Sequence, residues 1–248
     1  MEGIHIALKA ETLWTLFGFP VTNAVVTALT VSLLVAGSAI AAGRRLRLVP
    51  GRLQALWEMA VGDVYAYVAE VLESERLARR YFPLIASIFI FVLFGNLLHF
   101  LPGFGSIGFF AIEGEHTVFT PLLRSIATDL NFTLALALVA FIVIEFAGIA
   151  ALGALNYASK FVNLKSPLGF AIGIIDLFSE LARLFSFSFR LFGNIFAGEV
   201  MLGLLVALVP LVLPVPLMAF ELAVGVIQAA IFALLTLFFI KIAVTAMH

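Results

Sequence analysis

The chain has 248 residues, of which 63% are hydrophobic and 12% charged, and its mean hydropathy is +1.18. A soluble domain usually has about twice this charged fraction, so the composition excludes an ordinary soluble protein and indicates one embedded in lipid. The net charge of −1 gives no reason to expect a nucleic-acid partner, and the absence of cysteine excludes disulfides and thiolate metal sites.

Five long apolar stretches predict an all-α integral membrane protein with a single membrane domain. Each stretch reaches the roughly 20 residues that a spanning helix needs. An outer N-terminal segment comes first, over residues 1–22. The predicted membrane helices then cover residues 23–43, 81–101, 130–155, 166–209 and 216–247.

The segment between the first two helices, residues 50–80, has a different pattern. Its apolar residues recur at helical spacing, and charged side chains such as Glu58, Asp63 and Arg76 occupy the other side. This pattern predicts an amphipathic helix that lies on the membrane surface, with Pro50 near its start. A soluble helix packed on a partner is the alternative.

The last two stretches are too long to cross a membrane upright. As helices they would measure roughly 60 Å and roughly 45 Å at about 1.5 Å per residue, whereas the hydrocarbon layer is about 30 Å thick. Because no Gly-Pro break divides either stretch, we expect a strongly tilted helical hairpin.

Basic residues predict the orientation of the chain. Most of them lie between the first and second helices or between the third and fourth, and Lys241 is close to the end of the chain. Only Lys9 and Arg124 fall on the other side. By the positive-inside rule, the N-terminus lies outside and the C-terminus is cytoplasmic. The residues of the two connections are Arg44, Arg45, Arg47, Arg52, Arg76, Arg79, Arg80, Lys160 and Lys165.

Ionisable residues inside the apolar segments are the functional signal, because such residues are costly in lipid and normally face protein or water. Asp176, Arg183 and Arg190 follow one another at seven-residue spacing and therefore share one face of their helix. Asn194 lies one turn beyond Arg190, and Glu199 is nine residues beyond it, so Glu199 is predicted to face the opposite side.

Two further polar residues, Glu221 and Gln228, are seven residues apart on one face of the last helix. Arg190 needs a particular explanation, because residues 184–197 contain no acid and a guanidinium stays charged at any accessible pH. We expect its carboxylate partner to come from another chain. The alternative is that Arg190 pairs with Asp176 or Glu145 of its own chain and holds helices together.

The segment Ser188–Glu199, "SFRLFGNIFAGE", closely resembles the signature R-L-F-G-N-x-x-A-G-(E/H) of the a subunits of F-type ATP synthases. Four other segments are similar to family segments in the same order, so the resemblance covers nearly the whole chain. The sequence departs from the family where Leu184 replaces a frequent proline, and Glu221 occupies a variable position. The four segments are "VTNAVVTA" around Asn23, "NLLHFLP" at 96–102, "ATDLNFTLALAL" at 127–138 and "VIQAAIFALLT" at 226–236.

The resemblance implies a proton-translocating stator with two offset half-channels against a rotating ring of c subunits, in which Arg190 interacts with the ring carboxylate and blocks proton leakage. Further implied partners are the peripheral stalk of subunit b, the remainder of the complex and the lipid bilayer. The outer half-channel is expected to contain Glu199, Glu221, Gln228, Asn194, Asp129, Asn131 and His99. The cytoplasmic half-channel is expected to contain Asp176, Glu180, Glu145 and Arg183.

Several roles stay open at this stage. Glu199 and Glu221 hinder each other's ionisation if they share a low-dielectric site, which suits a proton relay, but the sequence does not say which acid holds the proton. His99 either touches the channel or is interfacial, and Glu145 either lines water or pairs with Arg183.

No nucleotide-binding glycine loop occurs, so we expect no bound nucleotide and place ATP chemistry on another subunit. We also expect no cofactor, no metal ion and no catalysis by this chain alone. Protons are favoured over sodium, and a bacterial inner membrane over other locations. The rival classes are a self-contained secondary transporter, which usually has two related halves, and a structural membrane scaffold.

Overall fold

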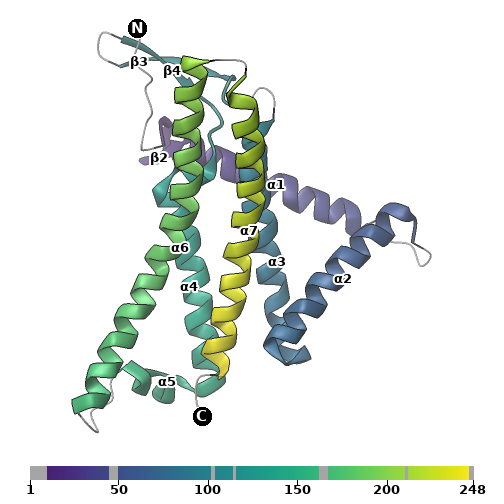
Figure 1. Ribbon diagram of the computed structural model, residues 1–248, viewed down its shortest axis with the longest axis vertical. Coiled ribbons are helices and arrows are strands. Elements are labelled where there is room, and N and C mark those ends of the chain that lie inside the picture. Colours follow the sequence, from purple (N-terminus) through teal and green to yellow (C-terminus); the bar gives the residue numbers. More distant parts are fainter. Residues whose placement is uncertain are drawn as a thin grey trace. The chain divides into compact units, whose positions relative to one another are not determined.

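The computed structural model describes residues 10–44, 50–101, 104–113, 116–161, 167–209 and 212–245. Helices dominate this part of the chain, and two short β-hairpins accompany them (Figure 1). The helices are α1 (Asn23–Gly43), α2 (Arg52–Leu72), α3 (Glu75–Leu97), α4 (Leu130–Leu152), α5 (Ala154–Phe161), α6 (Pro167–Leu208) and α7 (Pro214–Thr245). The strands are β1 (Thr12–Leu16), β2 (Phe19–Thr22), β3 (Gly108–Glu113) and β4 (His116–Pro121), and the 3₁₀ turns are η1 (Leu98–Phe100) and η2 (Ile126–Thr128).

Five helices in the described residues are long and apolar enough to cross a membrane, namely α1, α3, α4, α6 and α7. This finding confirms the predicted all-α membrane fold. Some of the predicted features lie outside the described residues. They are the orientation charges Lys9, Arg45, Arg47 and Lys165, the proline Pro102 of the "NLLHFLP" segment, and residues 1–9, 166, 246 and 247 at the ends of predicted segments.

The two hairpins are a difference from the sequence prediction. β1 and β2 pair antiparallel, with Leu16 opposite Phe19, and β3 pairs with β4 in the same sense. The first hairpin was hard to recognise because residues 12–22 are apolar on both faces, so no alternation of polar and apolar residues marks the strands.

The helix that was predicted to lie on the membrane surface also ends earlier than expected. α2 stops at Leu72 because Glu73 adopts a left-handed conformation with φ 50°, and its N–H donates to the Glu70 carbonyl. Ser74 then begins α3, since its hydroxyl accepts a hydrogen bond from the Leu77 N–H at 3.4 Å. The first residues of α3 therefore come from the segment that was predicted to lie on the surface.

The chain divides into two compact units, and α3, α4, α6 and α7 each contribute a segment to both. Unit 1 contains residues 1–46, 88–133 and 190–231, and unit 2 contains residues 47–87, 134–189 and 232–248.

Buried polar contacts connect the elements of unit 1. Asn23 is fully buried, and its side-chain amide donates to the Pro121 carbonyl at 3.3 Å. Farther along the chain, the Asn96 amide donates to the Gly225 carbonyl at 3.0 Å and so joins α3 to α7. Gly225 permits this approach, since a Cβ there would lie 3.1 Å from the Cβ of Asn96.

Aromatic packing organises the core of unit 2. The ring of Phe187 on α6 lies 5.1 Å from that of Phe232 and 5.6 Å from that of Phe239, both on α7. Leu237 and Ile240 on α7 are fully buried in the same unit. These contacts fix the segment of α6 that contains Glu180 and Arg183.

Candidate functional site

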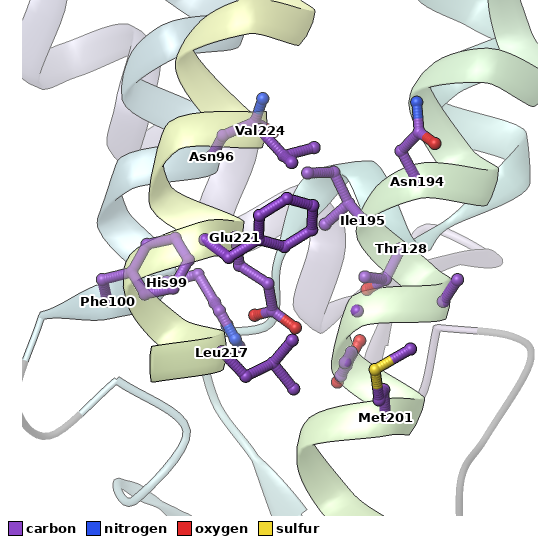
Figure 2. A pocket seen from close by; sticks show the side chains of 14 residues that line it. Asn96, His99, Phe100, Thr128, Asn194, Ile195, Met201, Leu217, Glu221 and Val224 are labelled. Carbon is purple, nitrogen blue, oxygen red and sulfur yellow. The ribbon is translucent and has the colours of Figure 1, made fainter. Parts of the chain in front are cut away.

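A cavity of about 240 Å³ lies in unit 1, lined by residues of α3, η1, η2, α6 and α7 (Figure 2). We call it the Glu221 cavity. Figure 2 shows Glu221 extending from α7 toward α6, with His99 beside it. The polar residues that line it are Asn96, His99, Thr128, Asn194, Glu199 and Glu221.

Gly198 explains how Glu221 can lie directly against α6. A Cβ at Gly198 would come within 2.5 Å of Oε1 of Glu221, so any other residue would push the carboxyl group away. Glu221 is only 9% exposed, and the neighbouring Glu199 lines the same cavity. The glycine of the "AGE" sequence thus lets two acids from different helices share one cavity.

A second cavity, of about 320 Å³, is lined by Glu11, Arg124 and Ser125 and also by His99 and Glu199. We call it the Arg124 cavity. The Arg124 side chain is held in place because its Nε donates to the Thr128 hydroxyl at 3.2 Å. The two cavities therefore share His99 and Glu199.

Unsatisfied polar atoms concentrate at these cavities. Within the described part of unit 1, the buried side-chain atoms without a hydrogen-bond partner in the chain all belong to residues that line one or both cavities. Buried polar groups normally have partners, and water molecules in a cavity can supply them where several such groups converge. The atoms are Asn96 Oδ1, His99 Nδ1, Ser125 Oγ, Glu199 Oε2 and Glu221 Oε1. The arrangement suits a hydrated path that includes two carboxyl groups and an imidazole.

Three residues predicted for the same path do not line the Glu221 cavity. Gln228 is buried on α7, seven residues beyond Glu221. One carboxylate oxygen of Asp129 accepts hydrogen bonds from the backbone N–H and the side-chain amide of Asn131, at 3.0 and 3.2 Å. Asp129 thereby caps the beginning of α4.

Arg190 is half-buried on α6, one turn before Asn194. Asn194 and Glu199 were predicted to face opposite sides of the helix, yet both line the Glu221 cavity. The cavity extends around α6 because Ala197 and Gly198, which also line it, are small. Arg190 accordingly lies one helical turn from a residue of the cavity wall.

A second polar group, which we call the Arg183 cluster, lies in unit 2 and consists of Glu145, Tyr157, Glu180 and Arg183. A guanidinium nitrogen of Arg183 is 2.6 Å from a carboxylate oxygen of Glu180, which is almost fully buried. The Arg183 guanidinium also lies over the ring of Phe239, 3.8 Å from its centroid. Asp176 is half-buried on α6, seven residues before Arg183.

Tyr157 is a member that sequence reasoning missed. Its hydroxyl donates to Oε2 of Glu145 at 3.0 Å, and its ring packs against Gly148, where a Cβ would come within 2.3 Å of it. Burial, followed by the negative charge of Glu145, raises the pKa of Tyr157 above its ordinary value. Tyr157 therefore stays protonated and remains a donor to Glu145.

Sequence reasoning also missed Glu11, Arg124 and Ser125 as site residues, whereas Asn96 and Thr128 entered only as parts of family segments. Arg124 offered the clearest signal, because it is a lone arginine in the apolar stretch "PLLRSIA". Its charge on the predicted outer side indicated only the orientation of the chain.

Comparisons with known proteins test the family resemblance. A family model described as ATP synthase A chain matches residues 24–241. The chain is 35% identical over 209 residues to an ATP synthase subunit a of Campylobacter jejuni, which covers 83% of each chain. It is 32% identical over 221 residues to that of Moorella thermoacetica (89% of this chain and 90% of the relative). It is 38% identical over 212 residues to that of Gloeobacter violaceus (85% and 79%).

These matches confirm the resemblance drawn from the "RLFGNIFAGE" segment. The matched region begins within α1 and ends within α7, so it extends over all five membrane helices. The chain belongs to the ATP synthase A chain family, and it is a proton-translocating membrane subunit of an ATP synthase rather than a catalytic one.

Proposed function

We propose that this chain forms two offset half-channels against a rotating ring of c subunits, and that Arg190 interacts with the carboxylate of each passing ring subunit. The observation that supports the outer half-channel best is the pair of cavities that share His99 and Glu199. Protons enter through the Arg124 cavity and pass His99 into the Glu221 cavity, where either Glu199 or Glu221 can carry the proton. Asn194 at the wall of this cavity is one turn from Arg190.

The role of Arg190 follows from the energetics of charge in lipid. A ring carboxylate that faces hydrocarbon must be protonated, because an unpaired charge there is too costly. Beside a guanidinium the same carboxylate can ionise, since the positive charge stabilises the anion. A site that has lost its proton therefore cannot move into lipid until it is protonated again, and the fixed positive charge opposes direct proton leakage.

The inner half-channel is proposed to follow the Arg183 cluster. Glu145 and Glu180 supply proton-accepting groups there, and Asp176 lies farther along α6 toward its beginning. Arg183 balances part of the negative charge and holds Glu180 in place. Protons would leave through this group to the cytoplasm of a bacterium, with the N-terminus outside and the C-terminus inside. A peripheral stalk of subunit b would hold the chain against the ring.

Substitution of Glu199 tests the outer path. Glu199→Gln keeps the size of the side chain but removes its titratable proton, so proton-driven ATP synthesis should slow measurably, by up to about tenfold. The loss stays within this limit because Glu221 in the same cavity partly replaces Glu199. The measurement is the rate of ATP synthesis by the complete complex in vesicles with an imposed proton gradient.

The matched control is Glu70→Gln, which removes an exposed acid on α2, outside both cavities. Its rate should equal that of the unmodified complex. An unchanged rate in Glu199→Gln would remove Glu199 from the path. Proton transport by this chain alone, without the ring, would instead favour a self-contained transporter.

A further inference from the structure

The β1–β2 hairpin presents large apolar side chains directly before α1. Residues 12–22, which include both strands and the turn, contain no charged side chain. The exposed fraction is 94% for Phe17, 76% for Phe19, 55% for Leu16 and 47% for Trp14. Apolar side chains gathered in this way normally mark a surface that is covered by a partner or by lipid.

The turn residue Phe17 has an unfavourable backbone conformation. Its φ is 50° and that of Gly18 is 84°, so both residues of the turn are left-handed. Glycine, asparagine and aspartate tolerate this conformation, whereas a bulky residue has a steric cost there. Because the Phe17 side chain is 94% exposed, packing within the chain does not compensate for this cost. Pairing of β1 with β2 holds the turn instead, and it leaves the Phe17 side chain free to meet the surroundings of the chain.

The base of the hairpin is fixed to the first spanning helix. Thr12 pairs with Thr22, and α1 begins at the next residue, Asn23. The backbone N–H of Asn23 donates to the Glu11 carbonyl at 3.1 Å. The tip thus lies only a few residues from a helix that is long and apolar enough to cross a membrane. Apolar side chains of that helix are also exposed, and the exposed fraction of Leu33 is 74%.

We propose that the tip of the β1–β2 hairpin, residues 16–19, inserts into the membrane interface and anchors the beginning of α1 in lipid. Lipid is the occupant because the uncharged hairpin continues directly into a spanning helix, and because aromatic residues favour the boundary between hydrocarbon and water. Pairing of β1 with β2 satisfies part of the backbone, which lowers the cost of placing the tip at this boundary.

The absence of cysteine allows a direct test. The full chain with Phe17→Cys is labelled with a nitroxide and placed in phospholipid vesicles, and collisions with oxygen are compared with collisions with a water-soluble nickel complex. Leu33→Cys on α1 serves as the lipid reference, and Asp63→Cys, exposed on α2, as the water reference. The oxygen-to-nickel ratio at position 17 should approach the Leu33 reference and exceed the Asp63 reference several-fold. A ratio equal to the Asp63 reference, or a label shielded from both agents by protein, would overturn the proposal.

A second variant separates anchoring from turn formation. Phe17→Asn suits the left-handed turn better but removes the apolar tip, while Phe17→Leu keeps an apolar tip. In a Trp57→Phe background, Trp14 is the sole tryptophan, so brominated lipids report its contact with the bilayer. Quenching of Trp14 should fall by half or more in Phe17→Asn and persist in Phe17→Leu. Equal quenching in Phe17→Asn and the parent chain would contradict anchoring by the tip.

Discussion

Replacing Arg190 with alanine is expected to reduce proton-driven ATP synthesis by about a hundredfold or more, while the complex still assembles. Removing one fixed group that stabilises a developing charge slows a reaction by about 10²–10³-fold. Under the proposed mechanism, loss of the guanidinium leaves the ring carboxylate with no fixed charge beside it, so the carboxylate stays protonated and cannot release its proton to the inner path. The measurement is ATP synthesis in vesicles with an imposed proton gradient.

For the same variant we expect passive proton leakage to rise, although ATP synthesis falls. If Arg190 separates the half-channels, membranes that contain Arg190→Ala should leak protons faster than the parent when rotation is blocked. Arg76→Ala, which removes an exposed arginine on α3, is the matched control and should change neither quantity. Co-purification of the ring with the variant chain checks assembly. Normal synthesis by an assembled Arg190→Ala complex would remove this residue from the mechanism.

The double variant Glu199→Gln/Glu221→Gln is expected to lose about 10²–10⁴-fold in transport rate, the range that one general acid–base group contributes. Each single variant should lose about tenfold or less, because the remaining acid lines the same cavity. The loss in the double variant should therefore exceed the product of the two single losses. ATP-driven acidification of inverted vesicles measures the rate.

The matched control for this pair is Glu58→Gln/Glu70→Gln, which removes two exposed acids from α2. It keeps the charge change identical but leaves both cavities intact. A double variant at Glu199 and Glu221 that is no slower than the slower single variant would show that the acids act in series rather than replacing each other. The proposal that Glu199 and Glu221 replace each other would then be wrong, although both acids would still belong to the outer half-channel.

The membrane helices were predictable because a run of roughly 20 apolar residues has few alternatives to a spanning helix. The cap at Ser74 and the left-handed Glu73, which separate α2 from α3, were harder to predict. Amphipathic and spanning patterns merge there without Gly or Pro, so periodicity alone does not locate the break. Apolar residues on both faces similarly concealed β1 and β2.

Contacts within one helix were accessible from spacing, and contacts between helices were not. Glu180 and Arg183 are three residues apart, so their ion pair could have been read from the sequence. The hydrogen bond from Asn96 to Gly225 joins residues 129 positions apart and depends on how α3 meets α7. The approach of Glu221 to Gly198 likewise depends on packing. The cavity that contains both predicted acids is a product of these approaches.

The partner of the Arg190 guanidinium in the assembled complex tests the central claim most directly. A high-resolution cryo-EM map of this chain with its ring should place that guanidinium within about 4–6 Å of a ring carboxylate, the range over which an opposite charge favours ionisation. A map in which Arg190 turns away from the ring and pairs with Asp176 or Glu145 of its own chain would contradict the account.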